Sequence, residues 1–261
     1  LPYLSEQRIG GAVVRTPRLR HEIPAGLDAR LAGLRVDAIL RRGKYLLLDC
    51  QSTCGGGWLL LHLGMSGSLR LVPPDTPAQK HDHVDLLFKH TVLRFRDSRR
   101  FGALLWHEGI GVESHPVLAD LGIEPLSEDF DGNWLYAAAH RRRMPIKPLL
   151  MDSRLVVGIG NIYAAESLHH AGISPQRSAD RISLRRYLVL ADAIRSTLAA
   201  SIAAGGSSVR DYVHSDGGAG CFQLSCAVYG RAGEACPTCA APVRVIRQAG
   251  RSTFYCPRCQ R

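Results

Sequence analysis

The sequence has no apolar run that approaches the ~18 residues needed to cross a bilayer, no internal repeat and no low-complexity tract. The first absence excludes a membrane-spanning helix within these 261 residues, and the others exclude a solenoid or a disordered polar arm. We also expect no secretory leader at the start of the chain. Hydrophobic residues make up 46% of the sequence, which is enough to build a globular core.

Acidic residues are the scarcer charged class. The chain has 23 Asp and Glu against 33 Lys and Arg, which gives a formal net charge of +10. A surplus of that size favours polyanionic partners, nucleic acid first and an anionic membrane surface second. A basic protein without such a partner is the alternative interpretation.

Cysteines are few, but four of the eight form two Cys-x-x-Cys pairs near the C-terminus. Four thiolates in this spacing can bind one Zn²⁺ tetrahedrally, and two such knuckles joined by a hairpin make a zinc ribbon. A module of roughly 30 residues buries too little apolar surface to fold alone, so the metal would supply its folding free energy. Disulfides or unrelated thiols are the alternatives. The predicted zinc ligands are Cys236, Cys239, Cys256 and Cys259.

The other four cysteines show no paired spacing of this type, and together with a thiolate metal site they indicate a reducing, cytoplasmic setting. They are Cys50, Cys54, Cys221 and Cys226. The ribbon itself is rich in arginine, which suggests that the metal presents cationic side chains and does no chemistry. These arginines are Arg244, Arg247, Arg251, Arg258 and Arg261.

The first ~115 residues contain short aliphatic runs separated by Gly, Pro or polar breaks, a spacing typical of an antiparallel sandwich or barrel. Two segments, 55–57 and 73–77, are predicted loops by composition. The predicted strands lie at 9–15, 36–40, 45–49, 58–63, 68–72, 84–88 and 92–95.

From about Leu121 the apolar spacing becomes helical. Ser183 is the expected N-cap of a long helix that Gly205 and Gly206 end. Shorter helices are predicted at 134–142, 145–151 and 161–170. The predicted fold class is therefore a multidomain α+β protein, with a β domain at 1–118, a helical domain at 119–225 and a zinc ribbon at 226–261.

A glycine turn, Gly158-Ile159-Gly160, precedes a predicted helix with Asn161 at its cap. Backbone N–H groups at a helix start form an anion site, and a nucleic-acid phosphate is the expected anion. A tight structural turn is the alternative. Lys147 and the run 141–143, which is Arg-Arg-Arg, lie just upstream and favour the phosphate.

Two glycine-bounded turns carry side chains that could fill a gap in duplex DNA. Met65 lies between Gly64 and Gly67, and Arg99 and Phe101 lie in a second turn. Proteins that extract a base need an apolar wedge and a donor for the orphaned partner base. Ordinary loop packing is the alternative.

Lys44 follows Arg41 and Arg42 at a strand start. Neighbouring positive charge could make its amine more nucleophilic, or the amine could simply bind a phosphate.

His81 and His83 flank Asp82, but alternate side chains of a strand point to opposite faces. We therefore expect phosphate contact or a structural role here and no second metal.

Taken in order, these segments resemble the formamidopyrimidine-DNA glycosylase family, and the similarity covers essentially the whole chain. The matching segments are 42–48, 62–70, 80–86, 97–102, 146–152, 157–168, 228–236 and 251–260. The resemblance implies an N-terminal antiparallel β-sandwich, a helix-two-turn-helix domain and a C-terminal zinc ribbon, with bent DNA held between them.

The resemblance also implies a role for each matching residue. Met65, Arg99 and Phe101 would fill the void left by the everted nucleotide. Lys44 would serve the strand-cutting elimination and Arg251 the second elimination. The segment 215–220 would close over the flipped purine. The residues expected to hold phosphates around the lesion are His81, Arg142, Lys147 and Asn161.

The expected activity is that of a bifunctional DNA N-glycosylase and AP lyase that excises formamidopyrimidine and 8-oxoguanine from damaged double-stranded DNA. We expect one structural zinc ion, no membrane partner, a monomer, and a cytoplasmic, nucleoid-associated location. The alternatives are a non-catalytic lesion-binding homologue and an endonuclease-eight-like enzyme that acts on oxidised pyrimidines.

One departure from the family pattern bears on catalysis. Family members begin with a proline whose amine attacks the sugar C1′, followed by a glutamate, whereas this sequence begins Leu1-Pro2-Tyr3, where Pro2 matches an internal position of the first helix. Either the sequence is a truncated form of an active enzyme, which we favour, or the protein only binds. We expect the 261 residues as written to bind lesions but to excise them poorly or not at all.

Overall fold

The computed structural model describes residues 2–206 and 226–261. The described residues form two compact units, one that extends to Ala119 and one that starts at Asp120. The helices that follow Asp120 and the zinc ribbon therefore belong to a single unit. Within the described ranges, no helix has both the length and the apolar character that crossing a bilayer would need.

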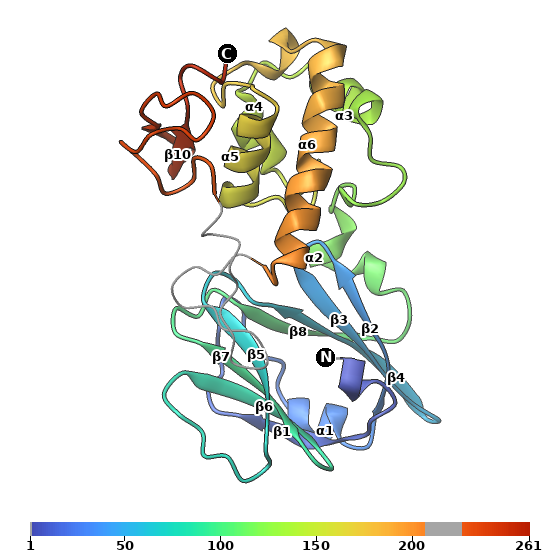
Figure 1. The fold of residues 1–261 in the computed structure, drawn as a ribbon. Helices are drawn as coiled ribbons and strands as arrows, with labels where there is room; N and C mark the ends of the chain where they lie inside the picture. The colour runs from blue at the N-terminus through green and yellow to red at the C-terminus, as the bar shows by residue number, and fades with distance from the viewer. Residues whose placement is uncertain (1, 207–225) are drawn as a thin grey trace. The chain divides into compact units, whose positions relative to one another are not determined.

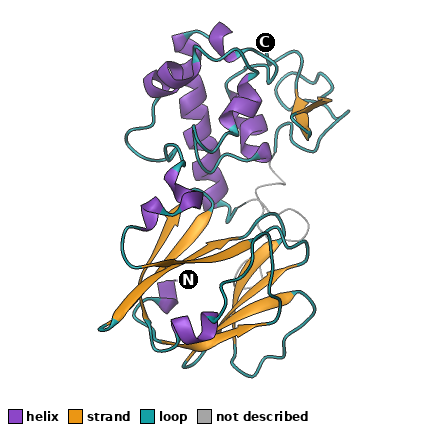
Figure 2. Ribbon diagram, turned by 180° about the vertical axis from the view of Figure 1, so that it is seen from behind, coloured by secondary structure: helices purple, strands orange, loops and turns teal. Residues whose placement is uncertain are grey.

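Two antiparallel four-stranded sheets build the first unit (Figures 1 and 2). One sheet has the order β1-β6-β7-β5 and the other β2-β3-β4-β8. The strands are β1 (Ile9–Val14), β2 (Arg35–Arg42), β3 (Tyr45–Ser52), β4 (Gly55–His62), β5 (Gly67–Val72), β6 (Asp82–Phe88), β7 (Val92–Asp97) and β8 (Ala103–Glu108). Short helical segments accompany them at η1 (Pro2–Leu4), α1 (Leu27–Leu31), η2 (Val112–Ser114) and α2 (Pro116–Ala119).

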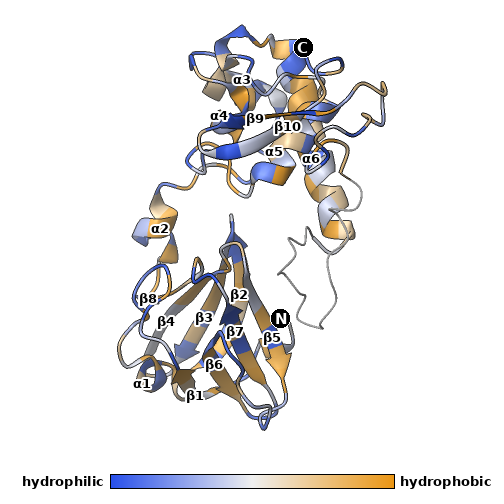
Figure 3. Cartoon of the chain, turned by 90° about the vertical axis from the view of Figure 1, so that its left-hand side faces the viewer, coloured by the Kyte–Doolittle hydropathy of each residue, from blue (hydrophilic) through white to orange (hydrophobic). Residues whose placement is uncertain are grey.

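The core of this unit forms between the two sheets, because hydrophobic residues run along strands of both (Figure 3). Leu59 and Leu61 from β4 and Leu93 and Phe95 from β7 are each at most 1% exposed and belong to one buried cluster. Burial of such side chains is the dominant favourable term in folding. The predicted antiparallel sandwich is confirmed.

The strand β4 begins earlier than its composition suggests. The predicted loop 55–57 is wrong, since these glycines pair with the end of β3 and Gly57 also pairs with β8. A Cβ on Gly57 would lie 2.6 Å from the Trp106 ring, so only glycine lets the neighbouring strand approach. The sequence analysis did not anticipate β8, whose six residues include Trp106 and a histidine and show no strict alternation.

The second unit is built around α6 (Leu184–Ala203), whose buried side chains recur at helical spacing. Asp131 caps α3 by accepting from Trp134 N at 2.7 Å. Ser183 holds the N-cap position of α6, but its side chain makes no capping hydrogen bond. The other helices are α3 (Gly132–Ala139), α4 (Ile146–Leu150), α5 (Asn161–His170) and η3 (Ala179–Arg181).

The zinc ribbon contains one hairpin, β9 (Arg244–Gln248) and β10 (Arg251–Tyr255). Arg251 pairs with Gln248, so the connecting loop has two residues. Those residues, Ala249 and Gly250, have φ of 45° and 76°, as a tight hairpin turn requires. Arg251 is therefore the first residue after the turn, at the exposed tip of the hairpin.

A buried ion pair links neighbouring strands of the β-sandwich. Arg94 is 5% exposed and donates to both carboxylate oxygens of Asp85, at 2.8 and 2.9 Å. Arg15 also donates to Asp85, at 2.6 Å. Burial alone would raise the pKa of the Asp85 carboxyl, but the hydrogen bonds from Arg94 and Arg15 bring it below its ordinary value.

We expect Asp85→Asn to lower the free energy of unfolding by about 3 kcal/mol at neutral pH, because it removes the two-oxygen counter-charge of the buried Arg94 guanidinium and leaves only Asp82, at 3.7 Å. The lowered pKa means that the wild-type contribution is present above the ordinary carboxyl pKa and is lost as the pH falls through the folded value. Urea denaturation at pH 7 and below pH 4 measures both effects. Equal stabilities of variant and wild type at pH 7 would contradict the assignment.

Candidate metal centre and nucleic-acid interface

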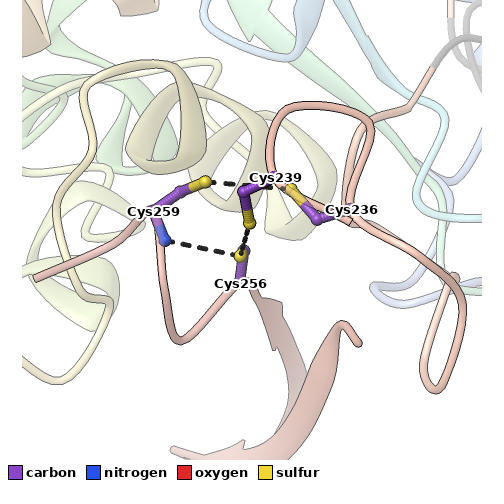
Figure 4. Close-up of side chains that lie close together, drawn as sticks. All are labelled: Cys236, Cys239, Cys256 and Cys259. Atoms are coloured by element: carbon purple, nitrogen blue, oxygen red, sulfur yellow. Dashed lines mark hydrogen bonds between the residues drawn. The ribbon is translucent and has the colours of Figure 1, made fainter. Parts of the chain in front are cut away.

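The four predicted zinc ligands converge on one point in the ribbon (Figure 4). Their sulfur atoms all lie within 4.8 Å of one another. Cys236 Sγ is 3.9 Å from Cys259 Sγ, and Cys239 Sγ is 3.4 Å from Cys256 Sγ. Tetrahedral coordination with Zn–S bonds of ~2.3 Å places sulfur atoms about 3.8 Å apart, so the observed spacing fits one zinc ion.

The chemistry of the donor set also fits zinc. Although burial opposes it, backbone N–H groups of Thr238 and Cys239 lower the pKa of the Cys236 thiol. A hydrogen bond with Cys239, and after it burial, raise the pKa of the Cys259 thiol, so a bound cation is needed to favour the thiolate form of all four ligands. Cys259 N donates to Cys256 Sγ at 3.4 Å in the second knuckle. Among the described residues, no other group of His, Cys, Asp or Glu side chains converges in this way.

The side chain of Glu166 ties α5 to the start of the ribbon. It is 2% exposed, and its carboxylate accepts from the backbone N–H groups of Ala227 (2.7 Å), Val228 (3.1 Å) and Tyr229 (2.8 Å). Hydrogen bonds to an ionised acceptor are stronger than neutral ones. The sequence analysis gave Glu166 no role, although a charged residue within the small and apolar run 164–168 was a signal that it is buried and paired.

A second link joins α4, α5 and β10 around Lys147. This side chain is 1% exposed, and its ammonium donates to Asn161 Oδ1 (2.5 Å), Thr253 Oγ1 (2.7 Å) and Ser252 O (3.4 Å). Asn161 Nδ2 in turn donates to Ser252 O at 3.0 Å. Burial, and after it the charge of Arg251, lower the pKa of Lys147 to about 8.

The expectation that Asn161 caps α5 is wrong. Gly160 occupies the N-cap position, with extended backbone, and Asn161 is the first residue of the helix. Its side chain faces Lys147 and the ribbon because both of its polar atoms find partners there. The glycine turn therefore leaves the helix start without a side-chain cap.

Three of the predicted phosphate and elimination residues thus gather at one place in the second unit: Lys147, Asn161 and Arg251. A small cavity of about 100 Å³ lies beside them, lined by Lys147, Pro148, Met151, Asp152, Gln248, Ala249 and Arg251. Arg142 is exposed. The pKa of Asp152 is lowered mainly by hydrogen bonds from Arg154 and to a smaller extent by the charge of Arg142. Positive charge is therefore concentrated around this cavity.

The three predicted void-filling residues gather in the first unit, on two turns at 64–67 and 98–102, which we call the wedge turns. Met65 and Phe101 are 54% and 45% exposed, unusually high for such side chains, and Arg99 is also exposed. The Arg99 guanidinium stacks over the Phe101 ring at 4.7 Å from the centroid. An apolar tip and a cationic donor thus lie side by side.

The remaining predicted residues occupy separate positions in the first unit. Lys44 is exposed at the β2–β3 turn, close enough to His62 for its charge to help lower the pKa of that histidine, after burial and Arg20. His81 immediately precedes β6 with φ of 76°, and its ring lies 6.3 Å from that of His83. The predicted purine loop, 215–220, lies outside the described residues.

We expect chelation of zinc to abolish retention of DNA while leaving the β-sandwich folded, because the metal supplies the folding free energy of the ribbon alone. Filter binding with metal analysis measures the first effect, and hydrogen exchange in residues 9–108 measures the second. Unchanged DNA binding after verified metal removal would contradict this assignment.

We expect Glu166→Gln to loosen the ribbon, since an amide in place of the carboxylate leaves backbone donors without an acceptor. A cost of about 2 kcal/mol corresponds to roughly 30-fold faster hydrogen exchange at these amides. The measurement is the exchange rate of the amides of Ala227, Val228 and Tyr229. Glu128→Gln, an exposed site in the same unit that loses the same charge, is the matched control; equal rates in the two variants would refute the link.

Three family descriptions match the chain. They are the formamidopyrimidine-DNA glycosylase N-terminal domain over residues 1–104, the formamidopyrimidine-DNA glycosylase H2TH domain over residues 121–213, and a zinc finger found in FPG and IleRS over residues 233–261. The last match and the cysteine geometry agree that the ribbon holds one structural zinc ion.

Relatives and solved structures extend the similarity over nearly the whole length. The formamidopyrimidine-DNA glycosylase of Dechloromonas aromatica (strain RCB) is 60% identical over 261 residues, which cover 99% of this chain and 94% of that protein. The MutM (FPG) protein from Thermus thermophilus has a TM-score of 0.86 at 38% identity, covering 99% and 93% of the two chains.

A complex between the Lactococcus lactis Fpg and an abasic-site-containing DNA has a TM-score of 0.89 at 34% identity, covering 100% of this chain and 94% of that one. The formamidopyrimidine-DNA glycosylase of Ralstonia pickettii (strain 12J) is 50% identical over 277 residues, covering 100% and 95%. By these matches, and by the fold and metal centre that agree with them, the chain belongs to the formamidopyrimidine-DNA glycosylase family.

Proposed function

We propose that this protein is a DNA repair glycosylase and AP lyase that excises oxidised purines from duplex DNA and cleaves the abasic strand. The observation that carries the proposal is the pair of wedge turns, where Met65, Phe101 and Arg99 lie exposed together. An apolar side chain can fill the gap left by an everted nucleotide, while a guanidinium can donate to the base that has lost its partner. Damaged double-stranded DNA is the partner, and the protein acts as a monomer.

The positive charge around the ribbon supports the same function. Bending DNA and everting a base cost several kcal/mol, which contacts to phosphates offset. Arg142 and Arg251 are exposed and can meet phosphates directly. Lys147 is buried, so it acts on phosphates through Asn161 and the hairpin that it holds. His81, in the first unit, completes the set of phosphate contacts.

The chemistry is covalent. An amine attacks the sugar C1′ and displaces the damaged base. The deoxyribose ring opens to give a Schiff base with this amine. The Schiff base withdraws electrons from the sugar, so the two phosphates leave in successive eliminations. Lys44 serves the strand-cutting elimination from its exposed position at the β2–β3 turn, and Arg251 serves the second elimination. The zinc ion has no part in these steps, since four thiolates leave no open coordination position.

The proposed domain boundaries are 1–118 for the β-sandwich, 119–225 for the helix-two-turn-helix domain and 226–261 for the ribbon. The proposed location is the cytoplasm, in association with the nucleoid, where four zinc-bound thiolates stay reduced.

The function is tested by borohydride trapping of the full gene product on a duplex that contains 8-oxoguanine. A covalent adduct, and release of oxidised guanine in preference to thymine glycol, are the expected results. Lesion-specific binding without an adduct would favour a non-catalytic lesion-binding protein. Preference for thymine glycol would favour an enzyme specific for oxidised pyrimidines.

We expect Arg99→Ala to weaken discrimination of the opposite cytosine more than overall affinity, because one lost hydrogen-bonding side chain changes base readout by about 1–3 kcal/mol. Binding to 8-oxoguanine duplexes with each of the four opposing bases measures the change. Equal losses for every opposing base would count against this role of Arg99.

A further inference from the structure

The carboxylate of Asp97, the last residue of β7, lies beneath both wedge turns. Its side chain is fully buried, at 0% exposure. Oδ1 accepts from Ser66 Oγ at 2.5 Å, in the turn that carries Met65. Oδ2 accepts from Gly102 N at 2.7 Å, in the turn that carries Arg99 and Phe101. One ionisable group therefore connects the two turns, and Ser66 lies 31 residues before it in the sequence.

A third donor closes this network. Arg99 N lies 3.2 Å from Asp97 Oδ1 and 3.3 Å from Ser66 Oγ, so the backbone of Arg99 is held by both residues. Among the described residues, the hydrogen bonds of the Asp97 carboxylate all go to the wedge turns and none to the sheet. A buried carboxylate with these partners fixes the turns through hydrogen bonds that are stronger than neutral ones.

The main chain of Asp97 extends the network toward the predicted phosphate ligand. Asp97 N donates to His81 O at 3.1 Å, and the Nε2 atom of His83 donates to Asp97 O at 2.7 Å. The residue before β6 is thus positioned by the same part of β7. His81 holds its left-handed backbone conformation within this arrangement.

The two wedge turns also touch through their backbones. Gly64 has φ of 64°, and a Cβ there would lie 2.6 Å from the carbonyl carbon of Phe101. Gly64 N donates to His62 Nδ1 at 2.9 Å. Burial, Arg20 and Lys44 lower the pKa of His62 to about 4, so the ring is neutral at physiological pH and this nitrogen stays an acceptor. The turns form one preassembled unit.

We propose that Asp97 is the positioning residue that holds Met65, Arg99 and Phe101 in one preformed wedge, ready to enter the duplex. The inference rests on the proposed function, because the wedge has a use only if a nucleotide is everted. Asp97 touches neither substrate nor reacting atoms; it acts through Ser66, Arg99 and Gly102. Preorganisation of this kind reduces the entropy lost on binding.

The test compares Asp97→Asn and Ser66→Ala with wild type and with Ser98→Ala. Asp97→Asn keeps the shape of the side chain but replaces one carboxylate oxygen with an NH₂ group. That NH₂ group then faces a hydrogen-bond donor of one wedge turn instead of accepting from it. Ser66→Ala removes the 2.5 Å hydrogen bond to Asp97 and the acceptor that lies 3.3 Å from Arg99 N. Ser98→Ala changes an exposed serine of the other wedge turn, at 98–102, and is the matched control.

Each protein is titrated with duplexes that carry 8-oxoguanine opposite cytosine, 8-oxoguanine opposite adenine, or no lesion. We expect Asp97→Asn to lower the cytosine-to-adenine affinity ratio about tenfold, the effect of losing a hydrogen bond to a charged group. Ser66→Ala should lower it less, about threefold, because Asp97 keeps its charge and its hydrogen bonds from Arg99 N and Gly102 N. Affinity for intact duplex, and the ratio in Ser98→Ala, should stay as in wild type.

The cytosine-to-adenine affinity ratio distinguishes a positioning role from simple loss of folded protein. An unfolded fraction lowers the apparent affinity for all three duplexes by the same factor and leaves the ratio unchanged. If wild type shows no preference for the lesion, the proposed function fails. If wild type discriminates and both folded variants keep its ratio, the role of Asp97 is overturned. Should Asp97→Asn not fold, Ser66→Ala against Ser98→Ala decides in the same way.

Discussion

A charged group removed from water must find hydrogen-bond partners, and this constraint organises both halves of the molecule. Asp97, Glu166 and Lys147 are each at most 2% exposed. Asp97 and Lys147 bond to a turn or hairpin that carries an exposed side chain, and Glu166 bonds to the backbone at the start of the ribbon. Leaving such a group unpaired costs several kcal/mol, so the loops have little freedom to move apart. The exposed residues of the site have well-defined positions because buried residues hold the backbone beneath them.

The ribbon illustrates how little of this precision comes from apolar burial. Its own core is small, with Val228 and Val243 packed near the cysteines. The metal therefore shapes the knuckles, while Glu166 and Lys147 fix the module to α4 and α5. The metal determines the internal shape of the ribbon. The buried polar contacts determine where Arg251 lies relative to Asn161.

Sequence patterns predicted the parts of the fold that depend on local periodicity. The helix 161–170 has the predicted bounds, and the sandwich follows from short aliphatic runs separated by Gly, Pro or polar breaks. The patterns missed what depends on partners far along the chain: the pairing of Gly57 with β8, the turn of Asn161 toward the ribbon, and the links made by Glu166 and Asp97. Spacing also identified the zinc ligands, because their geometry is encoded within two short motifs.

The ammonium buried between α4 and β10 makes the folding of the second unit a proton-linked reaction. The pKa of Lys147 is about 8 in the folded chain against an ordinary value of 10.5, so the unfolded state binds more protons between these values. Stability contributed by this site therefore increases as the pH rises from about 8 toward 10.5. Near pH 9 the unit releases a proton to the buffer as it folds, and its calorimetric enthalpy will include the ionisation heat of whichever buffer receives it.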